Sequence, residues 1–273
     1  MTMKPIQSGF TLVEIAIVLL IVTILLGYTV ALFPRQQELK QYRALEQRMD
    51  QVIEAIIGFA QVNGRLPCPA QPDAAGIEDI DGTDGCNTYA GFVPVNTLGL
   101  DGRFNEDSLL TDPWGNPYRY YVTDVDFNTD SKSDFTAPDQ MRTVGLVDSD
   151  GDGYIDLDGR YLICRAASAD DICDGNPPVF GNAGAGHYAG APFVLLSMGK
   201  NWAEATAGDE LENSGNTTVT SASGNNYLLK DVASGETNFV RRPGGLADDF
   251  DDVVRWVSPS LLFSRMIQAG QLP

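Results

Sequence analysis

Residues 10–33 read FTLVEIAIVLLIVTILLGYTVALF, and Glu14 is the only charged residue among them. At roughly 1.5 Å per residue, a helix of this length measures about 36 Å, which is enough to span a bilayer. The preceding residues, MTMKPIQSG, are short and mostly polar. A secretory signal instead has its cleavage site after the apolar core. Cleavage ahead of the run would therefore leave a membrane helix on the mature protein.

Glu14 is the unusual residue of this run. A carboxylate inside lipid is costly and normally pairs with another group. Cleavage between Gly9 and Phe10 would create a free amino group at Phe10. That amine could neutralise Glu14, either within the chain or on a neighbouring subunit. A plain signal-anchor helix with Glu14 near the membrane interface explains the same residues equally well.

The stretch GFTLVEIAIVLLIVTILLG, residues 9–27, resembles the class III signal of type IV pilins and type II secretion pseudopilins. The resemblance implies that a prepilin peptidase cuts the chain after Gly9 and methylates Phe10. It also implies that Glu14 guides assembly by pairing with the N-terminal amine of a neighbouring subunit. The matching positions are Gly9, Phe10, Thr11, Leu12 and Glu14.

An amphipathic pattern follows the apolar run. Between Leu39 and Ala60, apolar residues recur at steps of three and four, with charged residues between them. Asn63-Gly64 and the prolines after it would end a helix. We therefore expect one helix from about Phe10 to Asn63, as in the pilin plan. Residues 1–9 would be the leader, 10–33 the membrane segment and 34–64 the amphipathic continuation.

Residues 65–273 are predicted to form an α+β head, in which an antiparallel sheet packs on the long helix. The segment DPWGNPY, residues 112–118, resembles one that leads into the first strand of the sheet in the major pseudopilin. Residues 204–226 are rich in Ser, Thr, Asn and Gly and are predicted to be a flexible surface insertion. The predicted strands are Tyr118–Val122, Thr143–Val147, Arg160–Cys164, Phe193–Met198, Tyr227–Val232 and Val253–Val257, and Ser258-Pro259 is predicted to open a short helix through Ile267.

The four cysteines contain no C-x-x-C pair, so neither a zinc ribbon nor a thioredoxin-like motif is supported. In an exported protein we expect two disulfides, and buried free thiols are the alternative. We predict the pairs Cys68–Cys86 and Cys164–Cys173, because each would close a short loop rich in Gly and Asp.

Three acidic segments are candidate calcium sites, with calcium as a structural cofactor. The strongest, DSDGDGYID, has the spacing of an EF-hand loop but lacks the final Glu, and a solvated acidic turn is the alternative. Its ligands would be Asp148, Asp150, Asp152, Tyr154 and Asp156. A weaker copy comprises Asp126, Asn128, Asp130 and Asp134. The third comprises Asp248, Asp249, Asp251 and Asp252, and it resembles the calcium loop near the end of the major pseudopilin, although a charged, solvated loop explains it equally well.

Charge and residue content exclude other classes of function. The formal net charge is −19, and 32 of the 37 acidic residues follow Arg65. Such a head repels phosphate backbones, so we expect no nucleic-acid partner. His187 is the only histidine and lies in a loop rich in Gly and Ala, so a Ser-His-Asp site has a single poor candidate. We expect no enzymatic activity.

The resemblance implies a structural subunit, a minor pilin or pseudopilin, of a type IV pilus or type II secretion filament. The protein would be single-pass in the bacterial inner membrane, with its head in the periplasm or, after assembly, on the cell surface. Its partners would be the prepilin peptidase, the inner membrane and other pilin or pseudopilin subunits, which it would contact through the N-terminal helix. The alternative function is a tip or adhesin-type binding subunit with a calcium-stabilised head.

Overall fold

The computed structural model divides the chain into two units, Met1–Glu46 and Gln47–Pro273. The backbone alone is described for residues 27–35, 183–184, 187–188 and 234. The residues described are 11–148, 155, 157–166, 173, 179–181, 183–184, 187–188, 190–202, 208–235, 237–242 and 250–273.

The helix α1 (Leu12–Asn63) has 52 residues, which confirms the predicted long N-terminal helix. In the first unit, every large aliphatic side chain from Leu12 to Leu26 is exposed, by 41–87%. Within the described residues, no helical segment combines the length and the apolar character needed to cross a membrane.

The part of α1 in the second unit has one buried face. Met49, Val52, Ile56 and Ala60 are fully buried at helical spacing, whereas Glu54 is exposed. This is the pattern of a helix that covers a core, as the sequence predicted. The helix ends at Gly64, whose φ of 70° is readily adopted only without a Cβ and whose N–H donates to the carbonyl of Ala60 at 2.8 Å.

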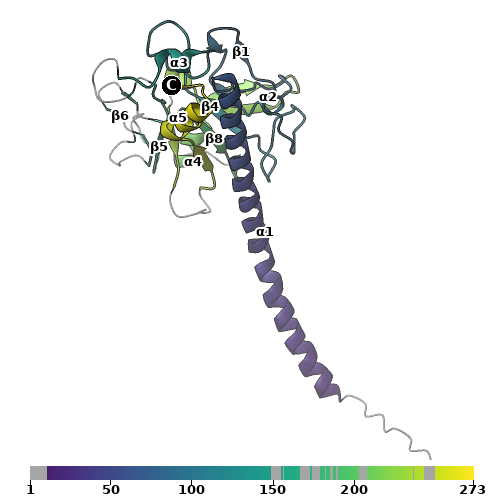
Figure 1. The fold of residues 1–273 in the computed structure, drawn as a ribbon. Coiled ribbons are helices and arrows are strands. Elements are labelled where there is room, and N and C mark those ends of the chain that lie inside the picture. Colours follow the sequence, from purple (N-terminus) through teal and green to yellow (C-terminus); the bar gives the residue numbers. More distant parts are fainter. Residues whose placement is uncertain are drawn as a thin grey trace, which may run out of the picture. The chain divides into compact units, whose positions relative to one another are not determined.

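The second unit contains a four-stranded antiparallel sheet in the order β12-β8-β4-β3, of which Figure 1 labels β4 and β8. The sheet and the separate helix confirm the α+β class. Three of these strands, β4, β8 and β12, coincide closely with predicted ones. The strands are β3 (Ala90–Phe92), β4 (Arg119–Val122), β8 (Phe193–Ser197) and β12 (Val253–Trp256).

One face of this sheet packs on a cluster of aromatic and aliphatic side chains. Tyr121 of β4 lies against Phe239, with ring centroids 4.9 Å apart, and Tyr161 lies 5.5 Å from the same ring. Phe239 belongs to β11 (Asn238–Val240), which pairs with β5 (Leu162–Cys164) in parallel. This parallel pair was not predicted, because the partner of a strand more than 70 residues away leaves no local trace in the sequence.

Short elements complete the second unit. Three antiparallel pairs, β1 with β2, β6 with β7 and β9 with β10, lie outside the central sheet. These elements are β1 (Ile80–Asp81), β2 (Gly85–Cys86), α2 (Val95–Leu98), α3 (Gln140–Val144), β6 (Ala183–Gly184), β7 (His187–Tyr188), α4 (Gly208–Ser214), β9 (Thr217–Thr220), β10 (Asn226–Leu229), η2 (Val232–Ser234) and α5 (Pro259–Gln268).

The helix α5 begins as predicted at Ser258, whose side chain accepts a hydrogen bond from the N–H of Leu261. The residues around α5 also contact the end of α1. Gln61 Nε2 donates to the carbonyl of Arg265 at 3.2 Å. Gln271 Nε2 donates to the carbonyls of Gln61 and Val62 at 3.1 and 3.2 Å. These bonds occupy carbonyls that the last turn of a helix leaves without intrahelical partners.

Two predictions of local structure were wrong. The predicted strand Thr143–Val147 overlaps the helix α3, in which Met141 and Val144 are buried three residues apart and Gly145 ends the turn. The predicted flexible insertion contains α4 and β9 in its described part. Asn213 of α4 donates to the backbone carbonyl of Val240 and accepts from its N–H. This polar segment is therefore folded, with its buried polar groups hydrogen-bonded.

Candidate functional site

Glu14 lies in the first turn of α1 and is bonded to Thr11. Its Oε2 accepts from the N–H of Thr11 at 3.2 Å and from the Thr11 hydroxyl at 3.3 Å. The N–H of Glu14 donates in return to Thr11 Oγ1 at 3.3 Å. This is a capping box, for which the signal is Thr or Ser followed three residues later by Glu. The sequence contains that signal, but this capping role was not predicted for Glu14. Gly9 and Phe10 lie outside the described residues.

The disulfides Cys68–Cys86 and Cys164–Cys173 both form, which confirms the two predicted pairs. The first closes the loop of residues 68–86, and Glu78 of this loop forms an ion pair with Arg65, which precedes it. Arg65 donates from Nη1 and Nη2 to the two carboxylate oxygens of Glu78, both at 2.8 Å. Glu78 also accepts from the N–H of Cys68 at 3.0 Å. The segment that follows α1 is therefore fixed covalently and by a bidentate charge pair.

The strongest predicted calcium loop falls almost entirely outside the described residues. Asp148 is described, whereas Asp150, Asp152, Tyr154 and Asp156 are not. Its ligand geometry therefore stays a prediction.

The weaker copy is described, and its side chains bond to the backbone of their own loop. Asp126 accepts from the N–H groups of Asp130 and Ser131 at 3.1 and 2.8 Å. Asp134 is buried and accepts from the N–H of Phe127 at 2.8 Å. Asn128 lies in the same loop, and its Oδ1 also accepts from Asp130. These contacts explain how the loop turns without invoking an ion.

In the third segment, Asp251 and Asp252 are described, whereas Asp248 and Asp249 are not. Asp251 Oδ2 accepts from the N–H groups of Lys200 and Asn201 at 2.6 and 3.3 Å. The segment before β12 therefore contacts the segment after β8. The approach is close, because a Cβ added at Gly199 would lie 2.3 Å from Asp251 Cγ.

Glu210 of α4 joins these two aspartates, and we refer to Glu210, Asp251 and Asp252 as the acidic cluster. Glu210 Oε1 accepts from the N–H of Asp251 at 3.3 Å and from the side chain of Asn201 at 2.8 Å. All three carboxyl side chains are buried. The sequence analysis missed Glu210, because only the fold brings α4 to this place.

Burial controls the electrostatics of the acidic cluster. It raises the pKa of Asp252 to about 8, against a smaller opposing effect of the hydrogen bond from Asn213. Burial also raises the pKa of Asp251. Asp251 Oδ1 is buried and has no hydrogen-bond partner among the residues described. A cation would supply what this oxygen lacks. The described residues nevertheless contain no group of three or more side chains arranged as metal ligands.

The segment DPWGNPY forms a turn whose first residue organises it. Asp112 accepts from the N–H groups of Trp114 and Asn116, both at 2.9 Å, and from the hydroxyl of Ser197 at 2.8 Å. The segment leads directly into β4. This strand is not the first of the sheet along the chain, because β3 precedes it. The turn is therefore anchored by a buried aspartate to the end of β8.

Residues 4–30 match the prokaryotic N-terminal methylation motif. The chain carries the N-terminal signature of type IV pilins and pseudopilins. The signature includes Gly9, Phe10 and the capping box of Thr11 and Glu14. Comparisons with curated proteins and with solved structures gave no match. The pilin signature thus covers only the start of the chain. A role for the second unit has to be inferred from its own contacts and pockets.

Proposed function

We propose that the chain is the precursor of a structural subunit, a minor pilin or pseudopilin, of a type IV pilus or type II secretion filament. The observation that carries this proposal is the pilin signature at residues 4–30, directly at the start of α1. In this proposal, prepilin peptidase cuts after Gly9 and methylates Phe10. The protein acts by assembling and not by catalysis.

The exposed apolar side chains of the first unit support anchoring in the inner membrane. The side chains from Leu12 to Leu26 present aliphatic surface on all sides of α1. Burial of one such side chain contributes about 1.5–3 kcal/mol, and contiguous exposed apolar surface marks a site that contacts lipid or protein. Lipid would cover this surface before assembly, and the equivalent helices of neighbouring subunits would cover it in the filament.

The disulfides support a head outside the cytoplasm. Disulfides persist in the oxidising periplasm and on cell surfaces, whereas cytosolic thiols are kept reduced. The second unit contains two of them and no free cysteine among the residues described. We therefore place residues 65–273 in the periplasm or, after assembly, on the cell surface.

Calcium is proposed as a structural ion of the head. The buried Asp251 Oδ1 supports a site at the acidic cluster, where Glu210, Asp251 and Asp252 would hold the ion together with Asp248 or Asp249. The loop of Asp148, Asp150, Asp152, Tyr154 and Asp156 is proposed as a second site from its spacing. Calcium in the cluster would favour the charged form of Asp252, whose pKa burial raises to about 8.

Mass spectrometry of the protein from cells with an active prepilin peptidase tests the proposed function. We expect a mature chain that begins at methylated Phe10. A Gly9→Leu variant should keep the chain at full length, whereas Ser8→Ala, next to it in the leader, should still be cut. A wild-type chain that retains Met1 would refute processing and, with it, filament assembly.

A further inference from the structure

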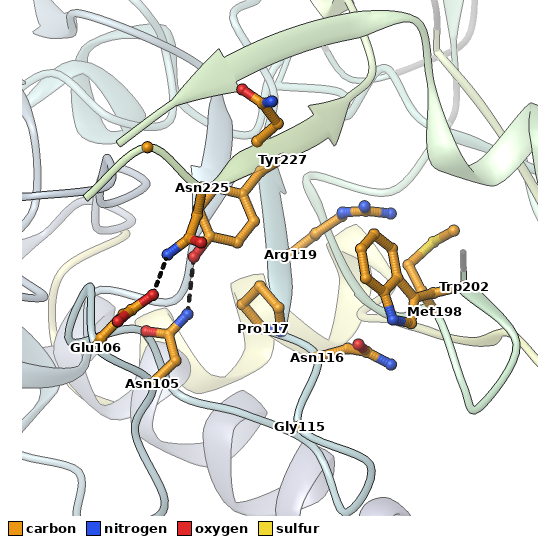
Figure 2. Close-up of a pocket in the computed structure, with 12 residues that line it drawn as sticks. Asn105, Glu106, Gly115, Asn116, Pro117, Arg119, Met198, Trp202, Asn225 and Tyr227 are labelled. Atoms are coloured by element: carbon orange, nitrogen blue, oxygen red, sulfur yellow. Dashed lines mark hydrogen bonds between the residues drawn. The ribbon is translucent and has the colours of Figure 1, made fainter. Parts of the chain in front are cut away.

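A pocket of about 410 Å³ opens in the second unit beside the central sheet. Its walls come from the turn before β4, the segment after β8 and the hairpin of β9 and β10 (Figure 2). A volume of this order matches sites for small organic ligands. Neither the pilin signature nor the proposed calcium ions account for this pocket.

Arg119 is the cationic group of the pocket wall. Its side chain is only 4% exposed, and its Nε and Nη1 have no hydrogen-bond partner among the residues described. Figure 2 shows the guanidinium group directed toward the side of the pocket where Trp202 lies. A buried guanidinium without acceptors is costly, whereas a carboxylate can accept from it in a bidentate arrangement. The pocket therefore favours a ligand with a carboxylate.

Two aromatic rings lie at opposite ends of the pocket (Figure 2). Tyr227 is fixed, because Asn105 Nδ2 donates to its hydroxyl at 2.9 Å and the hydroxyl donates to Asp107. Its ring also lies 5.1 Å from that of Phe92. Trp202 is 44% exposed at the other end. Exposed and partly exposed rings of this kind offer flat apolar surfaces to the C–H faces of a ligand.

Several polar groups of the pocket wall can act as acceptors. Asn116 Nδ2 donates to the carbonyl of Gly199, and Asn225 Nδ2 donates to Glu106 at 2.7 Å. No hydrogen bond within the described part of the chain uses Oδ1 of either asparagine. Together with the exposed carboxylate of Glu106, these oxygens would accept from several hydroxyl groups.

We propose that this pocket binds a hexuronic acid residue of an acidic glycan. Arg119 pairs with the carboxylate of the sugar, and Glu106, Asn116 and Asn225 accept hydrogen bonds from its hydroxyl groups. The rings of Trp202 and Tyr227 pack against its C–H faces. The proposal does not depend on filament assembly, and it assigns the head a ligand class of its own.

The net charge of −19 shapes how such a ligand binds. The acidic surface repels an anionic sugar at long range, and salt screens this repulsion over about 10 Å at 0.1 M. The buried contact with Arg119 is screened much less. Binding should therefore hold or strengthen between 50 and 300 mM NaCl, whereas adventitious ion pairing at the surface would weaken.

Calorimetric titration of the full chain in detergent micelles tests the proposal, with trigalacturonate and its trimethyl ester as probes. The ester differs only in its blocked carboxylates, and we expect it to bind at least about tenfold more weakly. Trp202→Ala and Arg119→Gln should each reduce the affinity for trigalacturonate at least about fivefold. Lys132→Gln removes one positive charge outside the pocket and should leave the affinity for trigalacturonate unchanged.

Three outcomes would overturn the proposal. The first is an ester that binds as tightly as the acid. The second is a Trp202→Ala variant with unchanged affinity for trigalacturonate. The third is that neither sugar binds. A tripeptide with a free C-terminal carboxylate that binds where trigalacturonate does not would assign the pocket to peptides instead. If Arg119→Gln fails to fold, the half-exposed Trp202 and the ester comparison still decide the question.

Discussion

Glu14 Oε2 and Thr11 are bonded at the first turn of α1, with the N–H and the hydroxyl of Thr11 both donating to the same carboxylate oxygen. The bonds are long, at 3.2 and 3.3 Å, and the carboxylate is exposed. Glu14 therefore has a role within its own helix before any neighbouring subunit arrives. In the proposed filament, the amine of Phe10 on a neighbour would compete with two weak donors.

This relationship separates two roles of Glu14 by mutation. Glutamine also functions at this position of a capping box, so Glu14→Gln should retain the helix start but lose the charge. We expect normal cleavage and a filament yield at least about tenfold lower, because a neutral amide cannot neutralise an amine. The measurement is the amount of the protein in sheared filament fractions.

Thr11→Ser is the control for the cap, since serine preserves both bonds. It should assemble like the wild type. Wild-type yield from Glu14→Gln would mean that Glu14 serves only as a cap and would contradict the assembly contact.

The acidic cluster predicts an unusual dependence of stability on pH when calcium is chelated. The folded pKa of Asp252, about 8, lies above its ordinary value of 3.8, so the folded state binds more protons than the unfolded state between these values. Stability should therefore fall as the pH rises through this window, by up to about 1.4 kcal/mol per pH unit for one proton. Melting temperatures at pH 5 to 9 in EGTA measure this slope.

Asp252→Asn should flatten that slope and raise the melting temperature most at pH 8, because the amide mimics the protonated acid. Asp101→Asn, at an exposed position, should leave the slope unchanged. A wild-type melting temperature that rises from pH 5 to pH 8 in EGTA would show that burial does not control Asp252.

Removal of calcium is expected to destabilise the head at neutral pH. An ion at about 100 times its dissociation constant stabilises the folded state by about 2.7 kcal/mol, so EGTA should lower the melting temperature by several degrees. If the acidic cluster holds an ion, Asp251→Asn should reduce the fall in melting temperature that EGTA causes. If the loop of residues 148–156 holds one, the double variant Asp148→Ala and Asp152→Ala should reduce the same fall. An unchanged wild-type melting temperature in EGTA would reject both sites.

Gly199 and Gly224 form a matched pair of sites. Comparing alanine at the two positions tests the contact between the segment after β8 and the acidic cluster. Both have left-handed backbones, with φ of 63° and 86°, so alanine costs about 1 kcal/mol at either. Only at Gly199 would the new Cβ meet another atom, Asp251 Cγ at 2.3 Å. Gly199→Ala should be at least about 1 kcal/mol more destabilising than Gly224→Ala in urea unfolding. Equal losses would mean that the Asp251 contact is not tight.

Patterns that depend on near neighbours in the sequence were predicted well. The end of α1 at Gly64, the start of α5 at Ser258 and the strand β8 each follow from a few adjacent residues. The disulfide pairs were also predicted, because each joins cysteines separated by 18 positions or fewer. Short-range chemistry was sufficient for all of these.

Features that depend on distant residues were missed. The helix α4 looked like a loop, because the partners of its buried Asn213, Val240 and Asp252, lie 27 and 39 residues away. Glu210 joins Asp251 across 41 residues, and Tyr227 is held by Asn105 across 122. None of these partners can be inferred from composition or periodicity. The acidic cluster and the pocket therefore became visible only in the folded unit.

The bonds from Gln271 to the last turn of α1 have a consequence for the order of biosynthesis. They join carbonyls of residues 61 and 62 to a side chain made more than 200 residues later. In the proposed subunit, the start of α1 would reach the membrane while most of the head is still on the ribosome, since chains fold from the N-terminus during synthesis. The far end of the same helix receives its final hydrogen bonds only after residue 271 has been added. In the proposed membrane-anchored subunit, Gln271 would have to be exported before the last turn of the helix could gain these bonds.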